Sequence, residues 1–199
     1  MRWSAPWNRW RRALEAPELW ALDLETTGLD ALTDHVLSVG MVPVRDRAIC
    51  WGERWSRRVQ APDDEVWTEA VGIHELLPAE ATDALSLDAL VDELADRLGD
   101  SVLLVHFGAL DVTMLQRLFA ERGRRWTVRH VVDTTHLLRR LDRRRRLIEP
   151  GAVDLPTQLG AARDALGLPP HDEHHALYDA LATAELFLAL RARLAPEAS

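Results

Sequence analysis

The stretch LWALDLETTGLD, residues 19–30, places two acids, Asp23 and Glu25, within an apolar run that predicts a β-strand. Side chains alternate along a strand, so these two carboxylates share one face. Paired carboxylates repel each other, and a bound divalent cation would relieve that cost because Mg²⁺ favours carboxylate and water oxygens. An isolated D-x-E pattern is more often two solvated acids at a strand end, so the rest of the chain has to decide between these interpretations.

The chain has 199 residues, 47% of them hydrophobic, which is enough for one well-formed core. We expect an appendage rich in tryptophan and arginine over residues 1–18 and a single domain over residues 19–195. The one cysteine excludes an internal disulfide, and together with the missing signal peptide it predicts a cytoplasmic setting. No apolar run is long enough to cross a bilayer, so stable membrane insertion is not expected.

Charge is distributed unevenly along the chain, although the formal net charge is −8. Residues 61–100 carry twelve acids and one arginine, whereas residues 117–146 carry eleven arginines and three acids. The acidic total argues against a general nucleic-acid coat protein. The arginine-rich stretch is nevertheless able to meet phosphates, so nucleic acid stays among the candidate partners.

The order of strand-like and helix-like patterns predicts an α/β fold with a mixed central sheet, because three strands come first and helices and strands then alternate. The charged run 139–154 is expected to be an exposed loop. The expected strands are 19–25, 35–44, 48–59, 101–107 and 127–133, and the expected helices are 86–100, 110–122, one containing Leu137 and Leu141, 155–166 and 175–194.

Two further acids occur where a carboxylate is unusual. Asp111 follows a buried strand at the start of a helix, where the helix dipole alone would favour an acid. Asp179 lies inside a strongly apolar helix, five residues after His174, and a buried acid needs a partner such as a metal ion. The nearby HDEHH segment, 171–175, is a weak zinc candidate because so compact a set of ligands lacks distant partners.

Taken together, these stretches resemble the motifs of the DEDDh family of 3′–5′ exonucleases, and most closely the proofreading epsilon subunits of bacterial DNA polymerase III. The order and spacing of all of them match over about residues 18–190. The stretches are DLETTG (23–28), EAVGIHELL (69–77), HFGALD (106–111), VVDTTHLLRR (131–140) and HHALYDA (174–180).

The resemblance implies a ribonuclease-H-like fold, with a five-stranded mixed sheet and helices on both faces. It implies a two-metal-ion hydrolysis of phosphodiesters, with two divalent cations, Mg²⁺ or Mn²⁺, as cofactors. It assigns His174 as the general base. The implied metal-binding acids are Asp23, Glu25, Asp111 and Asp179, and the residues implied to bind the 3′-terminal nucleotide are Thr26, Thr27, Gly28, Leu29, Glu69 and His74.

The expected substrate is the 3′ end of single-stranded or frayed DNA, in proofreading or repair, with a polymerase or another protein as a candidate partner. The motifs do not separate DNA from RNA, so an exoribonuclease or oligoribonuclease is an alternative. The oligomeric state stays open.

The chain departs from the family pattern at two places, and the first of them, in the second motif, supports a third hypothesis, an inactive nucleic-acid-binding or scaffold module. The second motif commonly reads HN-x-x-FD, but here Phe107 replaces the asparagine and Leu110 replaces the phenylalanine. Glu75 stands where the family usually has glycine, and it adds a negative charge beside the expected nucleotide site.

Overall fold

The computed structural model describes residues 14–60 and 84–195. The expected nucleotide-binding residues Glu69 and His74, the unusual Glu75 and most of the predicted appendage lie outside these ranges. The stretch that opens the sequence analysis forms β1 (Glu18–Thr26) at the centre of the fold.

The sheet is mixed, as predicted, and the described residues contribute six strands to it, in five positions because β3 and β4 both pair with β2. β1 pairs antiparallel with β2 and parallel with β5, and β6 continues the parallel half beyond β5. The predicted strand 48–59 is broken by a 3₁₀ turn, η1 (Trp51–Glu53), and its two halves β3 and β4 share the outer edge of β2. The strands after β1 are β2 (Val36–Arg45), β3 (Ala48–Ile49), β4 (Trp55–Arg58), β5 (Val102–Val105) and β6 (His130–Asp133).

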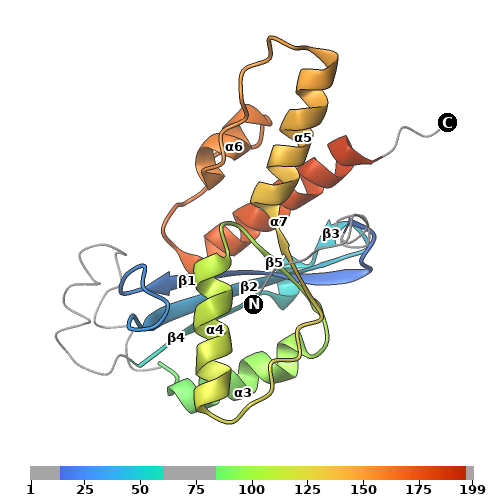
Figure 1. The fold of residues 1–199 in the computed structure, drawn as a ribbon. Helices are drawn as coiled ribbons and strands as arrows, with labels where there is room; N and C mark the ends of the chain where they lie inside the picture. The colour runs from blue at the N-terminus through green and yellow to red at the C-terminus, as the bar shows by residue number, and fades with distance from the viewer. Residues whose placement is uncertain (1–13, 61–83, 196–199) are drawn as a thin grey trace.

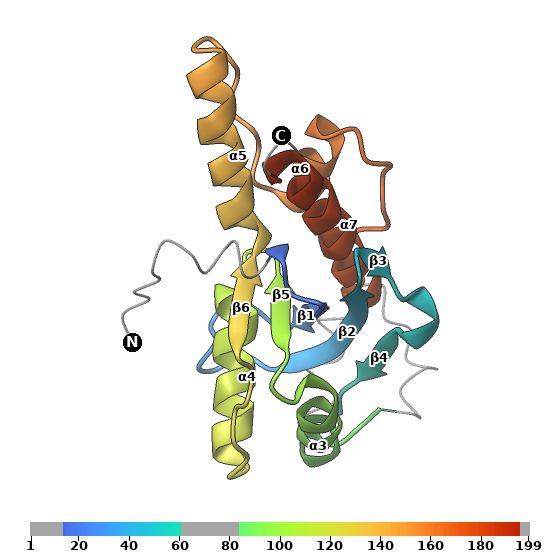
Figure 2. The ribbon, with the colours of Figure 1, turned by 90° about the vertical axis from the view of Figure 1, so that its right-hand side faces the viewer.

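Helices cover both faces of the sheet, which confirms the predicted α/β architecture (Figures 1 and 2). Trp20, Leu22 and Leu24 of β1 pack against α3 and α4, whereas Leu19 and Ala21 pack on the side of α5, α6 and α7. No helix within residues 14–60 and 84–195 is long and apolar enough to span a membrane. The helices are α3 (Leu87–Leu98), α4 (Ala109–Glu121), α5 (Thr134–Ile148), α6 (Leu159–Ala165) and α7 (Ala176–Leu194).

The prediction that residues 139–154 form a loop is wrong for their first ten residues, because α5 continues to Ile148. Arginine is a good helix former, and Arg146 pairs with Asp142 one turn earlier at 2.9 Å. The helix ends only before Pro150 and Gly151. The charge run is exposed as expected, but it lies on a helix that extends beyond the sheet (Figure 2).

Gly40 lets the start of α7 lie directly on the sheet. It is the cross-strand partner of Asp23, and a Cβ added to it would lie 2.2 Å from the backbone carbon of Ala176 and the nitrogen of Leu177. No side chain fits there, so the backbone of β2 contacts the first turn of α7. This contact places the first turn of α7 beside Asp23.

The substitution Gly40→Ala is expected to lower the free energy of unfolding by about 3 kcal/mol or more, because the backbone of α7 has to move away from β2. Chemical denaturation measures the effect. Gly52→Ala is the matched control, since an added Cβ at Gly52 meets nothing within 4 Å, and it should stay within about 0.5 kcal/mol of the parent. Equal effects of the two substitutions would contradict the contact.

Candidate active site

Three carboxylates meet where β1 ends and α7 begins. Asp23, Glu25 and Asp179 each offer an oxygen, and these atoms all lie within 4.8 Å of one another. Asp23 and Glu25 share one face of β1, as the two-residue spacing predicts. Asp179 is in the first turn of α7, which Gly40 holds against the sheet. Residues more than 150 positions apart in sequence are thus brought into one cluster.

Asp111 adds a fourth acid from α4. It lies in the first turn of α4, and its side chain is buried, like those of the apolar residues that follow it on this helix. Its carboxylate accepts a hydrogen bond from the backbone N–H of Leu24 in β1, and its charge raises the pKa of Asp23 and of Glu25. The four acids singled out from three separate stretches therefore interact with one another.

Burial and mutual repulsion make these acids hard to ionise together. Burial raises the pKa of Asp23 well above its usual value, and the charges of Asp111, Asp179 and Glu25 raise it further. The pKa of Glu25 rises to about 7, mainly through burial and then through Asp179 and Asp111. Burial, with a smaller effect of Asp133, raises the pKa of Asp111 to about 6. A bound cation would offset this cost.

His174, the predicted base, is exposed and precedes α7 in a left-handed backbone conformation, with φ of 66°. Its backbone N–H donates to Asp179 Oδ2 at 3.0 Å, so the residue is fixed at the edge of the carboxylate cluster. The neighbouring His175 has a different role, because its ring nitrogen accepts a hydrogen bond from the N–H of Leu177 and caps α7.

His171 contacts the cluster and was not singled out from the sequence. Its Nε2 lies 3.0 Å from Asp179 Oδ1, and its side chain is only 9% exposed. Burial raises the pKa of Asp179, while His171 and the backbone N–H groups of His174 and His175 oppose that rise. The HDEHH pattern drew attention to a group of histidines near Asp179, but only the fold shows that His171 is the one whose ring contacts Asp179.

The loop after β1 has a fixed shape and an exposed tip. Thr27 Oγ1 donates to Asp34 Oδ1 at 3.0 Å, and Thr26 Oγ1 donates to the carbonyl oxygen of Gly28 at 2.7 Å. A Cβ on Gly28 would lie 2.5 Å from the Asp34 carboxylate, so a side chain there would disturb this arrangement. Leu29 is 88% exposed, which leaves an aliphatic side chain available to a ligand.

The altered second motif is well packed. Leu110, which replaces the usual phenylalanine, packs against the core between the sheet, α3 and α4. The ring of His106 is held by Thr134 Oγ1 at 2.6 Å and by the carbonyl oxygen of Thr157 at 2.8 Å. Phe107 is half-exposed at a positive φ of 54°, the region that asparagine adopts more readily than phenylalanine. The altered motif therefore still places Asp111 beside Asp23 and Glu25, and its strained backbone lies at Phe107.

Residues 20–187 match the family described as Exonuclease. The chain belongs to the exonuclease family. Among its relatives, the PolC-type DNA polymerase III of Thermotoga petrophila is 28% identical over 169 residues, which cover 84% of this chain and 11% of that protein. The PolC-type DNA polymerase III of Staphylococcus haemolyticus is 25% identical over 167 residues, 83% of this chain and 11% of that protein. The resemblance seen in the motifs is thus confirmed.

Solved exonuclease structures share the fold. Exonuclease I of E. coli, in a complex with single-stranded DNA and zinc, superposes with a TM-score of 0.71 at 16% identity, over 90% of this chain and 41% of that one. Exonuclease I of Methylocaldum szegediense gives a TM-score of 0.68 at 18% identity, over 89% of this chain and 41% of that one. The chain spans about a tenth of its polymerase relatives and about two fifths of these solved chains.

The ligand atoms that this site offers fit hard divalent cations. Within the described ranges, the one metal-binding group of three that the geometry yields consists entirely of carboxylates, with no thiolate and no imidazole. Oxygen ligands suit Mg²⁺ and Mn²⁺, whereas structural zinc sites use cysteine and histidine. Asp23, Glu25 and Asp179 could hold a cation directly, and Asp111 adds charge beside them.

Stability of the metal-free protein should fall as the pH rises from about 4.5 to about 7. The folded protein retains a proton on Glu25 in this window, whereas the unfolded chain releases it at its ordinary pKa, so raising the pH favours unfolding. Thermal unfolding in EDTA measures this slope, and adding Mg²⁺ at pH 8 should raise the midpoint because the ionised cluster binds it.

The variant Glu25→Gln should flatten the slope, because glutamine does not titrate. Asp164→Asn, which removes an exposed carboxylate on α6, serves as the control and should leave it unchanged. A stability profile that rises with pH across this window in the metal-free protein would contradict the assignment.

Proposed function

We propose that this chain is a metal-dependent 3′–5′ exonuclease that releases nucleotides from the 3′ end of DNA. The observation that carries the proposal is the meeting of Asp23, Glu25 and Asp179 within 4.8 Å, with Asp111 beside them. Membership of the exonuclease family and the shared fold support it. Such a cluster is costly without cations, and phosphodiester hydrolysis is a reaction that uses them.

The four acids would hold two divalent cations, Mg²⁺ or Mn²⁺. When bound, the cations supply activation of water and stabilisation of the departing oxygen. The chain's own contribution is to fix the carboxylates in place, through the backbone contact at Gly40 and the hydrogen bond from the Leu24 N–H to Asp111. His171 keeps the Asp179 carboxylate in one orientation, because it contacts one oxygen while the His174 N–H contacts the other.

His174 is proposed as the general base that takes the proton of the attacking water. Imidazole titrates near neutral pH and therefore exchanges protons readily there. The exposed ring, next to a backbone N–H that is bonded to Asp179, has access to solvent and to the cluster.

The loop after β1 is proposed to hold the 3′-terminal nucleotide. Leu29 would pack against the terminal base, and Thr26, Thr27 and Gly28 would lie along its sugar and phosphate. The absence of a side chain at Gly28 allows close approach of the backbone. Predicted contacts from Glu69 and His74, outside the described residues, would complete this site.

The substrate class is proposed from the relatives. The matching polymerases are DNA polymerases, and the E. coli exonuclease I structure is a complex with single-stranded DNA. We therefore place the chain in DNA replication or repair, acting on single-stranded or frayed 3′ ends, with a polymerase as a candidate partner. A preference for RNA is the competing outcome, and it is measured in the same assay.

The test is hydrolysis of a 5′-labelled single-stranded DNA oligomer, and of its RNA counterpart, in Mg²⁺, Mn²⁺ or EDTA. A ladder that shortens from the 3′ end with metal and vanishes in EDTA is the expected result. The Asp23→Asn variant should lose the ladder but stay folded, since it removes a charge that burial disfavours. A folded parent protein that binds metal without hydrolysing either oligomer would favour the scaffold hypothesis.

The base can be tested with two adjacent histidines. His174→Asn should lower kcat by about 10²- to 10⁴-fold, because asparagine accepts no proton at neutral pH. Asparagine tolerates the left-handed backbone at this position, so the fold is preserved. His175→Asn is the control and should retain most of the activity, since asparagine also caps a helix well. Similar losses in both variants would argue against His174 as the base.

A further inference from the structure

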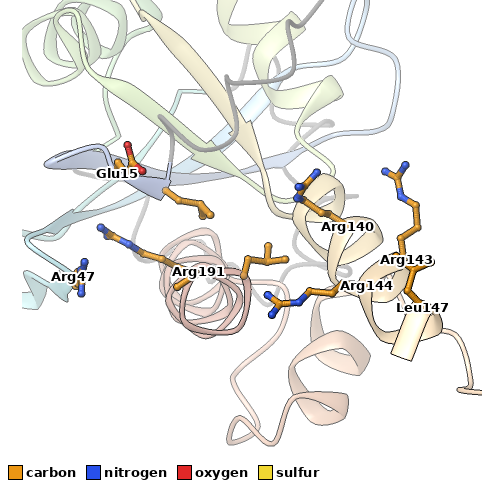
Figure 3. Close-up of a pocket in the computed structure, with 10 residues that line it drawn as sticks. Glu15, Arg47, Arg140, Arg143, Arg144, Leu147 and Arg191 are labelled. Atoms are coloured by element: carbon orange, nitrogen blue, oxygen red, sulfur yellow. The ribbon is translucent and has the colours of Figure 1, made fainter. Parts of the chain in front are cut away.

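A cavity with a volume of about 580 Å³ lies at the end of α7 opposite to the carboxylate cluster. Its walls carry five arginines and one acid, Glu15, and they come from four parts of the chain (Figure 3). The arginines are Arg47 from the turn after β2, Arg140, Arg143 and Arg144 from α5, and Arg191 from α7. We call this cavity the arginine pocket.

The arginine pocket is separate from the carboxylate cluster. Asp179 and Arg191 are twelve residues apart on α7, which corresponds to about 18 Å along the helix axis. Leu14 and Glu15 line the pocket and come just before the N-terminal end of β1, whereas Asp23 and Glu25 lie near the C-terminal end of β1. A ligand in the pocket therefore does not compete with the catalytic carboxylates for space.

Positive charge is concentrated in the pocket at an electrostatic cost. Burial lowers the pKa of Arg191, the charge of Arg47 lowers it further, and Glu15 opposes the effect. Arg144 reaches from α5 toward α7 and donates to the carbonyl oxygen of Arg193 at 3.2 Å, which holds the two walls together. An anionic ligand would relieve this repulsion, and guanidinium groups bind carboxylates with two parallel hydrogen bonds.

The pocket also offers apolar surface, and this decides the class of ligand. Leu147 lines the pocket and is 85% exposed, whereas Leu14 and Leu194 in the same lining are almost fully buried and offer little surface to a ligand. Ile148, the next residue on α5, is 78% exposed. Exposed aliphatic side chains beside charged ones are typical of protein-interaction surfaces. A phosphate backbone would use the arginines but would gain nothing from the leucines.

We propose that the arginine pocket binds an acidic segment of a partner protein, with carboxylates on the arginines and an apolar side chain against Leu147. Charge complementarity speeds the encounter, and the apolar contact adds specificity. The occupant acts as a tether, so the exonuclease would be held near its place of action while the carboxylate cluster stays open to a 3′ end.

The probe is a fluorescein-labelled decapeptide in which acidic residues alternate with leucine and phenylalanine, and the readout is fluorescence anisotropy. The parent protein should bind it saturably, and more weakly as salt is added. The double variant Arg143→Glu and Arg191→Glu should lower the affinity by about tenfold, because two contacts become repulsive. If the double variant is unstable, the single variant Arg143→Glu replaces it in the measurement, because Arg143 is exposed.

Arg125→Glu is the matched control, since Arg125 is exposed and lies outside the pocket. It should leave the affinity unchanged, and Leu147→Ser should weaken binding without loss of stability. A peptide with serine in place of leucine and phenylalanine should bind less tightly. The readout needs no hydrolysis, so it is independent of the proposed exonuclease activity.

Three outcomes would overturn the proposal: no saturable binding, equal affinity in the parent and the reversed variants, or equal binding of the serine peptide. A labelled DNA oligomer is measured in parallel. If the reversed variants lose affinity for DNA and the acidic peptide does not compete, the pocket belongs to a nucleic-acid path and the proposal fails.

Discussion

The contact between the backbone of β2 at Gly40 and the first turn of α7 is the constraint on which the rest of the candidate site depends. It brings Asp179 next to Asp23 and Glu25. With a side chain at position 40, the backbone of α7 would have to lie farther from the sheet. Close approach excludes water and raises the pKa of Glu25 to about 7. The same geometry that makes the cluster unfavourable alone suits it to hold a cation, because a positive charge would offset the repulsion between the carboxylates.

α7 connects two regions of opposite charge. Its first turn carries Asp179 within the carboxylate cluster, and its last turn carries Arg191 within the arginine pocket. Between them it packs on the sheet through buried residues such as Ala180, Leu186 and Phe187. Carboxylates are therefore clustered at one end of the helix and arginines at the other.

Most of the fold follows from local patterns. Alternation of Trp20, Leu22 and Leu24 with Leu19 and Ala21 predicts a central strand that is covered on both faces, and the helices pack accordingly. The observed strand boundaries differ from the predicted ones by a few residues. For example, β6 begins at His130, the first residue that pairs with β5, and not at residue 127. The extent of α5 was missed because a run of arginines suggests a loop, whereas ion pairs one turn apart stabilise it as a helix.

The sequence by itself determined the order of the elements, the shared face of Asp23 and Glu25 and, through resemblance, the acids expected to act with them. Only the tertiary structure decided that His171 contacts Asp179, and that arginines from the β2–β3 turn, α5 and α7 enclose one cavity. The reason is physical. Periodicity along a chain reports which face a side chain occupies, but the packing of distant segments determines what that face meets.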